Sequence, residues 1–84
     1  MNDRLVWDGV VAVIRDTFDD ASLEVTRETT ADDIPEWDSL RNVELVVALE
    51  SAFRVRLHTG EIARLKSVGE LADVIAARVR DDAR

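Results

Sequence analysis

The sequence predicts an all-α fold: a four-helix bundle of three longer helices and one short helix, with a long loop between the first two helices. Three observations lead to this prediction. Apolar residues recur at helical spacing in separate segments of the chain. A polar, acidic stretch separates the first two of these segments. The tripeptide VRL at residues 55–57 alternates like a strand but has no second strand to pair with, so we expect an extended connector there.

The first helix is expected over residues 2–18. Asn2 or Asp3 is a candidate N-cap, because short polar side chains accept hydrogen bonds from the first free amides of a helix. Trp7 and Val11 widen the apolar face beyond one stripe. The residues expected on that face are Leu5, Val6, Val10, Val13, Ile14 and Phe18.

Residues 19–38 form the predicted loop, in which eight acidic residues face a single cation, Arg27. Pro35 disfavours helical geometry at the preceding residue, Ile34. An irregular segment of this length is unusual in a compact domain, which indicates a functional or specially packed loop. We expect its few apolar residues to anchor it across the ends of helices: Leu23, Val25, Ile34 and Trp37.

The second helix is expected over residues 39–53, and Ser39 at its start is a candidate N-cap. This helix is apolar around most of its circumference, and a chain of 84 residues cannot bury every face of it. Some of Leu40, Val43 and Val47 must therefore stay partly exposed. An exposed apolar stripe flanked by acidic residues is typical of a docking surface.

The last two helices follow a short connector. Thr59 or Gly60 is expected to open a helix of one to two turns that contains Ile62 and Leu65. The sequence SVGE at residues 67–70 has the pattern of a capping box, in which serine and glutamate each accept from the other's amide. It should open the final helix, with these residues facing inward: Val68, Leu71, Val74, Ile75 and Val79.

Length and composition limit the possible functions. We expect one domain over residues 1–84, with a core over about residues 5–79. The formal charge of −7 argues against nucleic acid and anionic membranes and favours partners with basic docking surfaces. The first ten residues carry charges where a signal peptide needs an apolar region, and no apolar run is long enough to cross a bilayer. A cytoplasmic protein is therefore expected.

Groups that could form a catalytic or metal site are scarce. The chain has no cysteine and a single histidine, His58, in a polar connector where we expect a surface residue. It has no nucleophile elbow and no glycine-rich phosphate-binding pattern. The acidic loop has none of the glycine that a calcium-binding EF-hand needs, so no metal site is expected. We predict that the protein is not an enzyme and that any reactive group is supplied from outside.

The motif DSL at residues 38–40 opens the segment DSLRNVELVVALESAF, and the inward Ile62 and the final LADVI helix follow it. Over almost the whole chain this order resembles the acyl carrier protein family, including its peptidyl relatives. The resemblance implies that Ser39 carries 4′-phosphopantetheine, which a magnesium-dependent phosphopantetheinyl transferase takes from coenzyme A. The thiol of this arm would form thioesters, and the protein itself would catalyse nothing.

The resemblance also implies which residues partner enzymes recognise. Acyl-loading and acyl-transferring enzymes would contact the second helix of a monomeric carrier through basic and apolar groups. The matching positions in this chain are Asp38, Leu40, Val43, Glu44, Val47 and Glu50.

The chain departs from carriers of fatty acid synthesis at four positions. Trp37 stands where a small residue is usual, Arg41 stands where an acid is common, and Ser51 and Ala52 interrupt an acidic cluster. These changes weaken the negative patch and favour a freestanding carrier of polyketide or related secondary-metabolite biosynthesis. A peptidyl or D-alanyl carrier is the alternative within the family, and an acidic helical adaptor without a prosthetic group is the alternative outside it.

Overall fold

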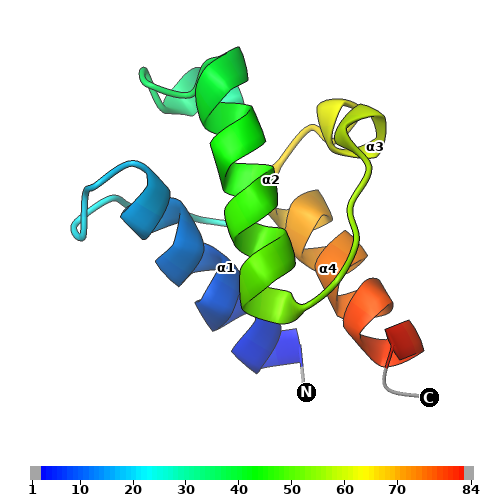
Figure 1. Cartoon of the computed structure of the whole chain (residues 1–84). Helices are drawn as coiled ribbons and strands as arrows, with labels where there is room; N and C mark the ends of the chain where they lie inside the picture. Colours follow the sequence, from blue (N-terminus) through cyan, green and yellow to red (C-terminus); the bar gives the residue numbers. More distant parts are fainter. Residues whose placement is uncertain (1–2, 83–84) are drawn as a thin grey trace.

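The computed structural model describes the backbone of residues 3–82 and the side chains of residues 3–80, except at positions 59 and 63. α1 packs against α2 and α4, and α3 packs against α2 (Figure 1). Within this part of the chain there is no strand, so the predicted all-α fold with three longer helices and one short helix is confirmed. The elements in chain order are α1 (Asp3–Thr17), the 3-10 turn η1 (Ala31–Asp33), α2 (Ser39–Phe53), α3 (Thr59–Ala63) and α4 (Val68–Asp82).

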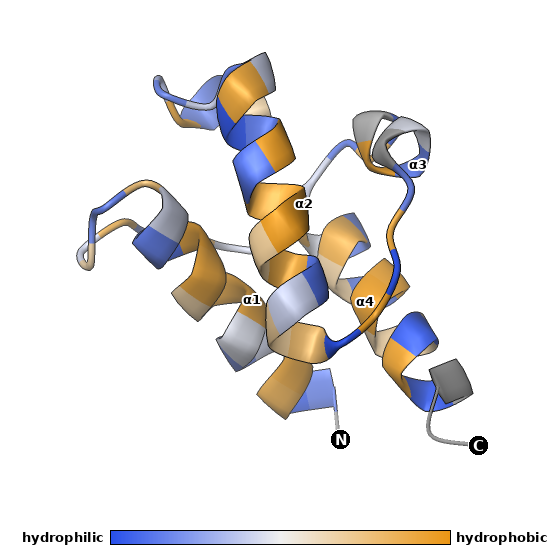
Figure 2. Cartoon of the chain, viewed as in Figure 1, coloured by the Kyte–Doolittle hydropathy of each residue, from blue (hydrophilic) through white to orange (hydrophobic). Residues whose placement is uncertain are grey.

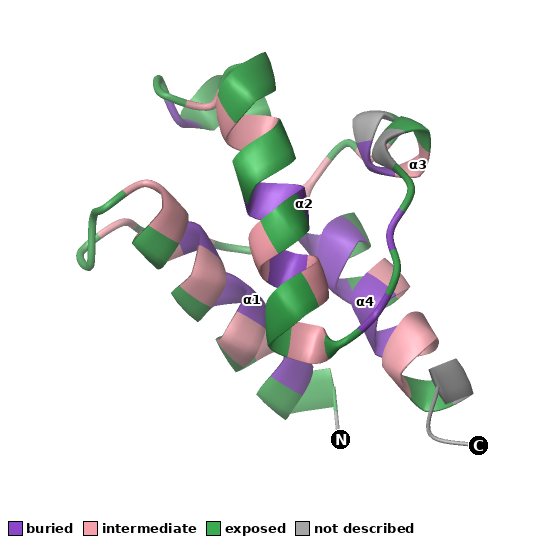
Figure 3. Ribbon diagram, in the orientation of Figure 1, coloured by how far each residue is buried: buried purple, intermediate pink, exposed green. Residues whose placement is uncertain are grey.

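The core lies where the inner faces of the four helices meet (Figure 3). Full burial of one aliphatic side chain stabilises the fold by about 1.5–3 kcal/mol, so this cluster holds the helices together. The connector between α2 and α3 contributes Val55 and Leu57, and it forms neither helix nor strand. The buried cluster comprises Val6, Val10, Ile14, Leu45, Val46, Leu49, Val55, Leu57, Ile62, Val68, Leu71, Ala72, Ile75 and Ala76.

α1 matches the predicted helix except at one end of its apolar face. Val6, Val10 and Ile14 are buried as expected, but Leu5 is 55% exposed, so its predicted place in the core is wrong. Each residue of an α-helix is rotated by about 100° from the one before it. Leu5 is therefore turned away from the line that joins Val6 to Val10. The candidate cap Asn2 lies outside the described residues.

Gly9 allows α1 to approach the end of α2 closely. A Cβ atom at this position would lie 2.7 Å from Cζ of Phe53, a distance that carbon atoms do not tolerate without a shift. The Phe53 ring packs against the core in the space that the missing side chain leaves. This close approach fixes the C-terminal end of α2 against α1.

The loop between α1 and α2 is anchored to the start of α4. The N–H of Val68 donates to the carbonyl of Thr29 at 2.8 Å, and the N–H of Gly69 donates to the carbonyl of Arg27 at 2.9 Å. These bonds satisfy two of the amides that a helix leaves free at its N-terminus. Ile34 is buried in extended conformation before Pro35, as predicted, but the loop also contains the short turn η1, which was not expected.

The predicted capping box at α4 is only half correct. The hydroxyl of Ser67 accepts from the N–H of Glu70 at 3.3 Å, as the pattern requires. The carboxylate of Glu70, however, accepts from the N–H of Lys66 instead of that of Ser67. The side chain thus reaches one residue further back than the capping box requires.

Side chains on α2 and α4 fix the connector and α3. Oε2 of Glu50 accepts from the N–H of Leu57 at 2.9 Å. Nη2 of Arg78 donates to both carboxylate oxygens of Glu61, at 2.8 and 2.7 Å, and its Nη1 donates to the carbonyl of Arg56 at 2.7 Å. The short helix α3 is thereby held against α4. None of the helices in residues 3–82 combines the length and the apolar character needed to cross a bilayer.

Candidate functional site

The N-terminus of α2 is capped by Asp38. This residue has extended geometry, with φ −105° and ψ −172°, and its Oδ1 accepts from the N–H of Arg41 at 2.9 Å. Ser39 is therefore the first helical residue, and the interpretation of Ser39 as the N-cap is wrong. The carboxylate one residue earlier occupies the capping position, so the serine hydroxyl is not needed to hold the helix.

The hydroxyl of Ser39 is exposed and has no hydrogen-bond partner among the residues that the structure describes. The other serines differ. Ser22 donates from Oγ to Asp20 at 2.7 Å, a bond that, together with one from its amide, holds the pKa of Asp20 below its ordinary value. Ser67 caps α4, and Ser51 lies in the last turn of α2. Ser39 is the serine that combines exposure, a free hydroxyl and a helix N-terminus.

Two backbone amides beside this hydroxyl are open. The N–H groups of Ser39 and Leu40 donate to no acceptor within residues 3–82. Free amides and the positive end of the helix dipole together favour an anionic group, by about 0.3–1 kcal/mol at an exposed site. A phosphodiester attached to Ser39 would fit this environment.

An apolar stripe extends from this site along the exposed face of α2. Leu40 is 66% exposed, Val43 is 49% exposed and Val47 is 59% exposed, which confirms the predicted exposure. The ribbon of α2 carries the apolar colour at many positions in Figure 2, and Figure 3 shows exposed positions between its buried ones. We call Leu40, Val43 and Val47 the α2 stripe.

The charged residues of α2 lie in different surroundings. Glu44 is exposed, and its Oε2 accepts from Nη1 of Arg41 at 3.1 Å. The same Nη1 lies 3.4 Å from the carbonyl of Thr17, at the end of α1. Glu50 is half-buried and bound to the amide of Leu57. Of the two predicted acidic recognition residues within α2, Glu44 and Glu50, only Glu44 therefore makes no bond to the connector.

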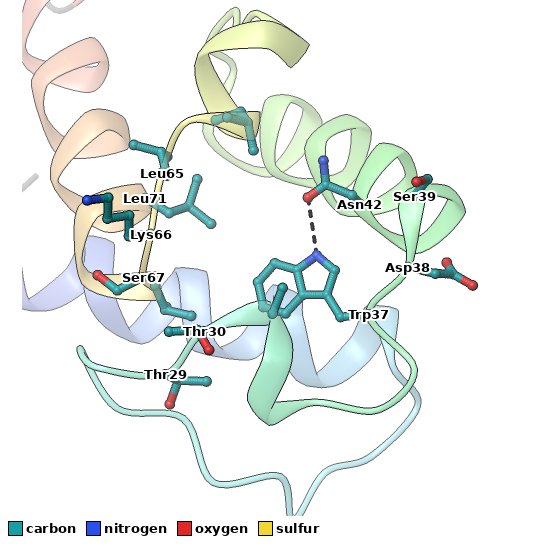
Figure 4. Close-up of a pocket in the computed structure, with 13 residues that line it drawn as sticks. Thr29, Thr30, Trp37, Asp38, Ser39, Asn42, Leu65, Lys66, Ser67 and Leu71 are labelled. Carbon is teal, nitrogen blue, oxygen red and sulfur yellow. Dashed lines mark hydrogen bonds between the residues drawn. The ribbon is translucent and has the colours of Figure 1, made fainter.

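A cleft of about 370 Å³ opens next to Ser39, between the loop, α2, α3 and the start of α4 (Figure 4). We call it the Trp37 cleft, because the half-buried indole of Trp37 lies in it. Nε1 of this indole donates to Oδ1 of Asn42 at 3.2 Å, and its ring packs against Phe18 with centroids 5.6 Å apart. The cleft is lined by Thr29, Thr30, Ala31, Trp37, Asp38, Ser39, Asn42, Ile62, Leu65, Lys66, Ser67, Val68 and Leu71.

The sequence alone does not predict the cleft or the bond by which Asn42 holds Trp37 in it. Trp37 and Asn42 are separated by a helix start, so no periodic pattern predicts their contact. His58, by contrast, is exposed before α3 as expected and does not line the cleft. Among the described side chains, no cluster of three or more histidine, cysteine, aspartate or glutamate residues could hold a metal ion.

Comparison with known proteins shows to which family the chain belongs. No model of a known protein family matches the chain. An acyl carrier protein of Acidothermus cellulolyticus is 37% identical over 68 residues, which cover 81% of each protein. One of Thermosynechococcus vestitus is 34% identical over 80 residues, which cover 94% of this chain and 98% of that protein. The chain belongs to the acyl carrier protein family.

A solved structure agrees with this assignment to the acyl carrier proteins. The solution structure of a holo acyl carrier protein from Geobacter metallireducens superposes with a TM-score of 0.85 at 38% identity. The match covers 93% of this chain and 90% of that one, which confirms the fold. The protein is accordingly a non-catalytic carrier with a 4′-phosphopantetheine group. When bound, this group supplies a thiol that forms thioesters with acyl groups, and phosphopantetheinyl transferase and acyl-handling enzymes are the general partners.

Proposed function

We propose that Ser39 is the attachment residue for 4′-phosphopantetheine and that the protein presents acyl thioesters from this position as a cytoplasmic, monomeric carrier. The observation that supports this most strongly is the free, exposed hydroxyl of Ser39 at the first residue of α2. The adjacent amides of Ser39 and Leu40 favour the phosphodiester, while the Asp38 cap keeps the helix end in place without using the hydroxyl.

Labelling with a fluorescent coenzyme A analogue and a promiscuous phosphopantetheinyl transferase tests the proposal. The wild type and Ser39→Ala are compared with Ser51→Ala, which removes an exposed hydroxyl at the opposite end of the same helix. We expect labelling of wild type and Ser51→Ala and none of Ser39→Ala. Labelling of Ser39→Ala at the wild-type rate would show that the arm is attached elsewhere.

We further propose that partner enzymes dock on the α2 stripe, with Asp38 and Glu44 as the charged contacts beside it. The stripe begins next to Ser39, so an enzyme that binds it lies within reach of the cargo. Burial of exposed apolar surface supplies affinity, and the charges supply orientation. The carboxylate of Glu50 accepts from the N–H of Leu57 and so holds the connector. We therefore do not include Glu50 in the proposed docking surface.

The pathway that we propose is specialised biosynthesis of the polyketide type. Two features support it. Arg41 pairs with Glu44 and so neutralises part of the acidic surface that a basic enzyme would meet. Trp37 fills space next to Ser39 that a small residue would leave open. An aminoacyl carrier of peptidyl or D-alanyl type is the competing possibility.

Loading assays separate these pathways. The holo protein is offered to a malonyl-transferring enzyme of fatty acid synthesis, to one of polyketide synthesis, and to an aminoacyl-adenylating enzyme. We expect faster loading by the polyketide enzyme. Preferential loading by the fatty acid enzyme or by the adenylating enzyme would contradict the specialised-pathway proposal but would leave Ser39 as the attachment residue.

A further inference from the structure

The indole of Trp37 lies between the attachment site and the apolar end of the cleft. In Figure 4 Ser39 lies on one side of the indole, and Leu65 and Leu71 lie on the other. All four side chains line the same cleft. A group that enters the cleft from the side of Ser39 therefore meets the bonded pair of Trp37 and Asn42 before it reaches Leu65 and Leu71.

Three contacts hold the indole in this position. Its Nε1 donates to Oδ1 of Asn42 at 3.2 Å, and Asn42 is fixed because it belongs to the first turns of α2. Its ring packs against Phe18, just beyond the end of α1. Its backbone N–H donates to the carbonyl of Ile34 at 3.0 Å, and Ile34 is buried. The side chain is thus fixed from α1, from α2 and from the loop.

The space that remains is small. A volume of about 370 Å³ is near the lower end of the 300–1,000 Å³ usual for ligand pockets. A chain that extends from the side of Ser39 as far as Leu65 and Leu71 would need the indole to move, which breaks the bond to Asn42 and separates two aromatic rings. A short acyl group needs neither change.

We propose that Trp37 determines cargo length: short acyl groups fit in front of the indole, whereas longer chains remain in solvent as long as Trp37 stays bound to Asn42. Trp37 is thereby a specificity-determining residue, and Asn42 is the positioning residue that holds it. This inference rests on the proposed attachment at Ser39.

The test compares acetyl-loaded and octanoyl-loaded forms of the wild type, Trp37→Ala and Trp37→Phe. Each is prepared by a promiscuous transferase from the acyl-coenzyme A, and attachment is first verified by intact mass. Thermal unfolding then measures how much each chain stabilises the protein, because a bound group that contacts only the folded state raises Tm. The indole N–H signal of the wild type in proton–nitrogen NMR spectra reports whether the contact with Asn42 persists.

For the wild type we expect the same Tm and the same Trp37 indole signal with either chain. For Trp37→Ala, octanoyl should raise Tm above the acetyl form by about 4 °C or more. Trp37→Phe removes the indole N–H but keeps an aromatic ring, and it should show a smaller rise. If Trp37→Ala does not fold, Trp37→Phe takes its place as the variant that lacks the bond to Asn42.

Three outcomes would overturn the inference. These are an octanoyl-dependent Tm rise in the wild type equal to that in the variants, the absence of a rise in every protein, or a wild-type indole signal that moves with octanoyl. Failure of the proposed function would look different, because Ser39→Ala would then gain the mass of a loaded arm, or the wild type would gain none.

Discussion

The N–H of Gly69 donates to the carbonyl of Arg27 at 2.9 Å, and a Cβ atom on Gly69 would lie 2.8 Å from that same oxygen. The loop that carries one wall of the Trp37 cleft therefore meets α4 backbone to backbone. Only a residue without a side chain allows this approach. The bond between Val68 and Thr29 lies beside it and continues the same contact.

Gly69→Ala should therefore destabilise the protein. The added methyl group meets a backbone oxygen that cannot rotate away, and overpacking of this kind costs about 1–3 kcal/mol. Urea unfolding measures the change. Gly60→Ala is the matched control, because a Cβ there meets nothing within 4 Å, and it should leave stability unchanged or raise it by about 0.5–1 kcal/mol. Equal effects of the two substitutions would refute the close contact.

Two substitutions of Asp38 separate its capping role from its proposed recognition role. Asp38→Ala removes the acceptor for the Arg41 amide and should lower the free energy of unfolding by about 1 kcal/mol. Asp38→Asn keeps an equally good cap but removes the charge. We expect Asp38→Asn to retain stability and to be modified more slowly by the transferase. If the transferase modifies Asp38→Asn at the wild-type rate, Asp38 caps the helix but takes no part in recognition.

Arg78→Ala should loosen α3 and the connector. The guanidinium binds the Glu61 carboxylate and the Arg56 carbonyl from a partly buried position, so its loss should cost about 1 kcal/mol. Arg80→Ala is the control, because its pair with Asp3 is largely exposed and such pairs contribute little. Chemical denaturation compares the two variants. A larger loss for Arg80→Ala would contradict this explanation.

The α2 stripe predicts a loss of partner binding without a loss of stability. Leu40→Ser combined with Val47→Ser removes two exposed apolar side chains, so the unfolding midpoint should hardly change. KM for the transferase should rise about tenfold, the effect of roughly 1.4 kcal/mol of lost apolar contact. Leu5→Ser, an exposed leucine on α1, should leave KM unchanged. A similar KM increase for Leu5→Ser would show that the stripe is not the docking surface.

Local patterns in the sequence predict the helices well, because each helix buries a stripe of regular spacing. The predicted bounds of α2 agree with the structure. The predicted exposure of its apolar stripe also agrees, at Leu40, Val43 and Val47. Leu5 lies at the edge of the apolar stripe of α1, and the spacing of apolar residues does not show how wide a stripe the neighbouring helices cover.

Contacts between segments distant in sequence were not predictable. The capping of α4 by the carbonyls of Arg27 and Thr29 involves backbone atoms, which every residue has, so no residue type indicates it. The bond between Trp37 and Asn42 depends on how the loop enters α2. At the site itself, serine and aspartate are both good caps, and only the geometry shows that Asp38 has this role and leaves the Ser39 hydroxyl free.

The position of the arm tests the central claim most directly. After incubation with coenzyme A and a transferase, the protein is digested with trypsin, and residues 28–41 form one peptide that contains three hydroxyl residues: Thr29, Thr30 and Ser39. Fragmentation mass spectrometry should place a single phosphopantetheine on Ser39 and leave both threonines unmodified. An arm on Thr29, on Thr30 or in any other peptide would contradict the assignment of Ser39.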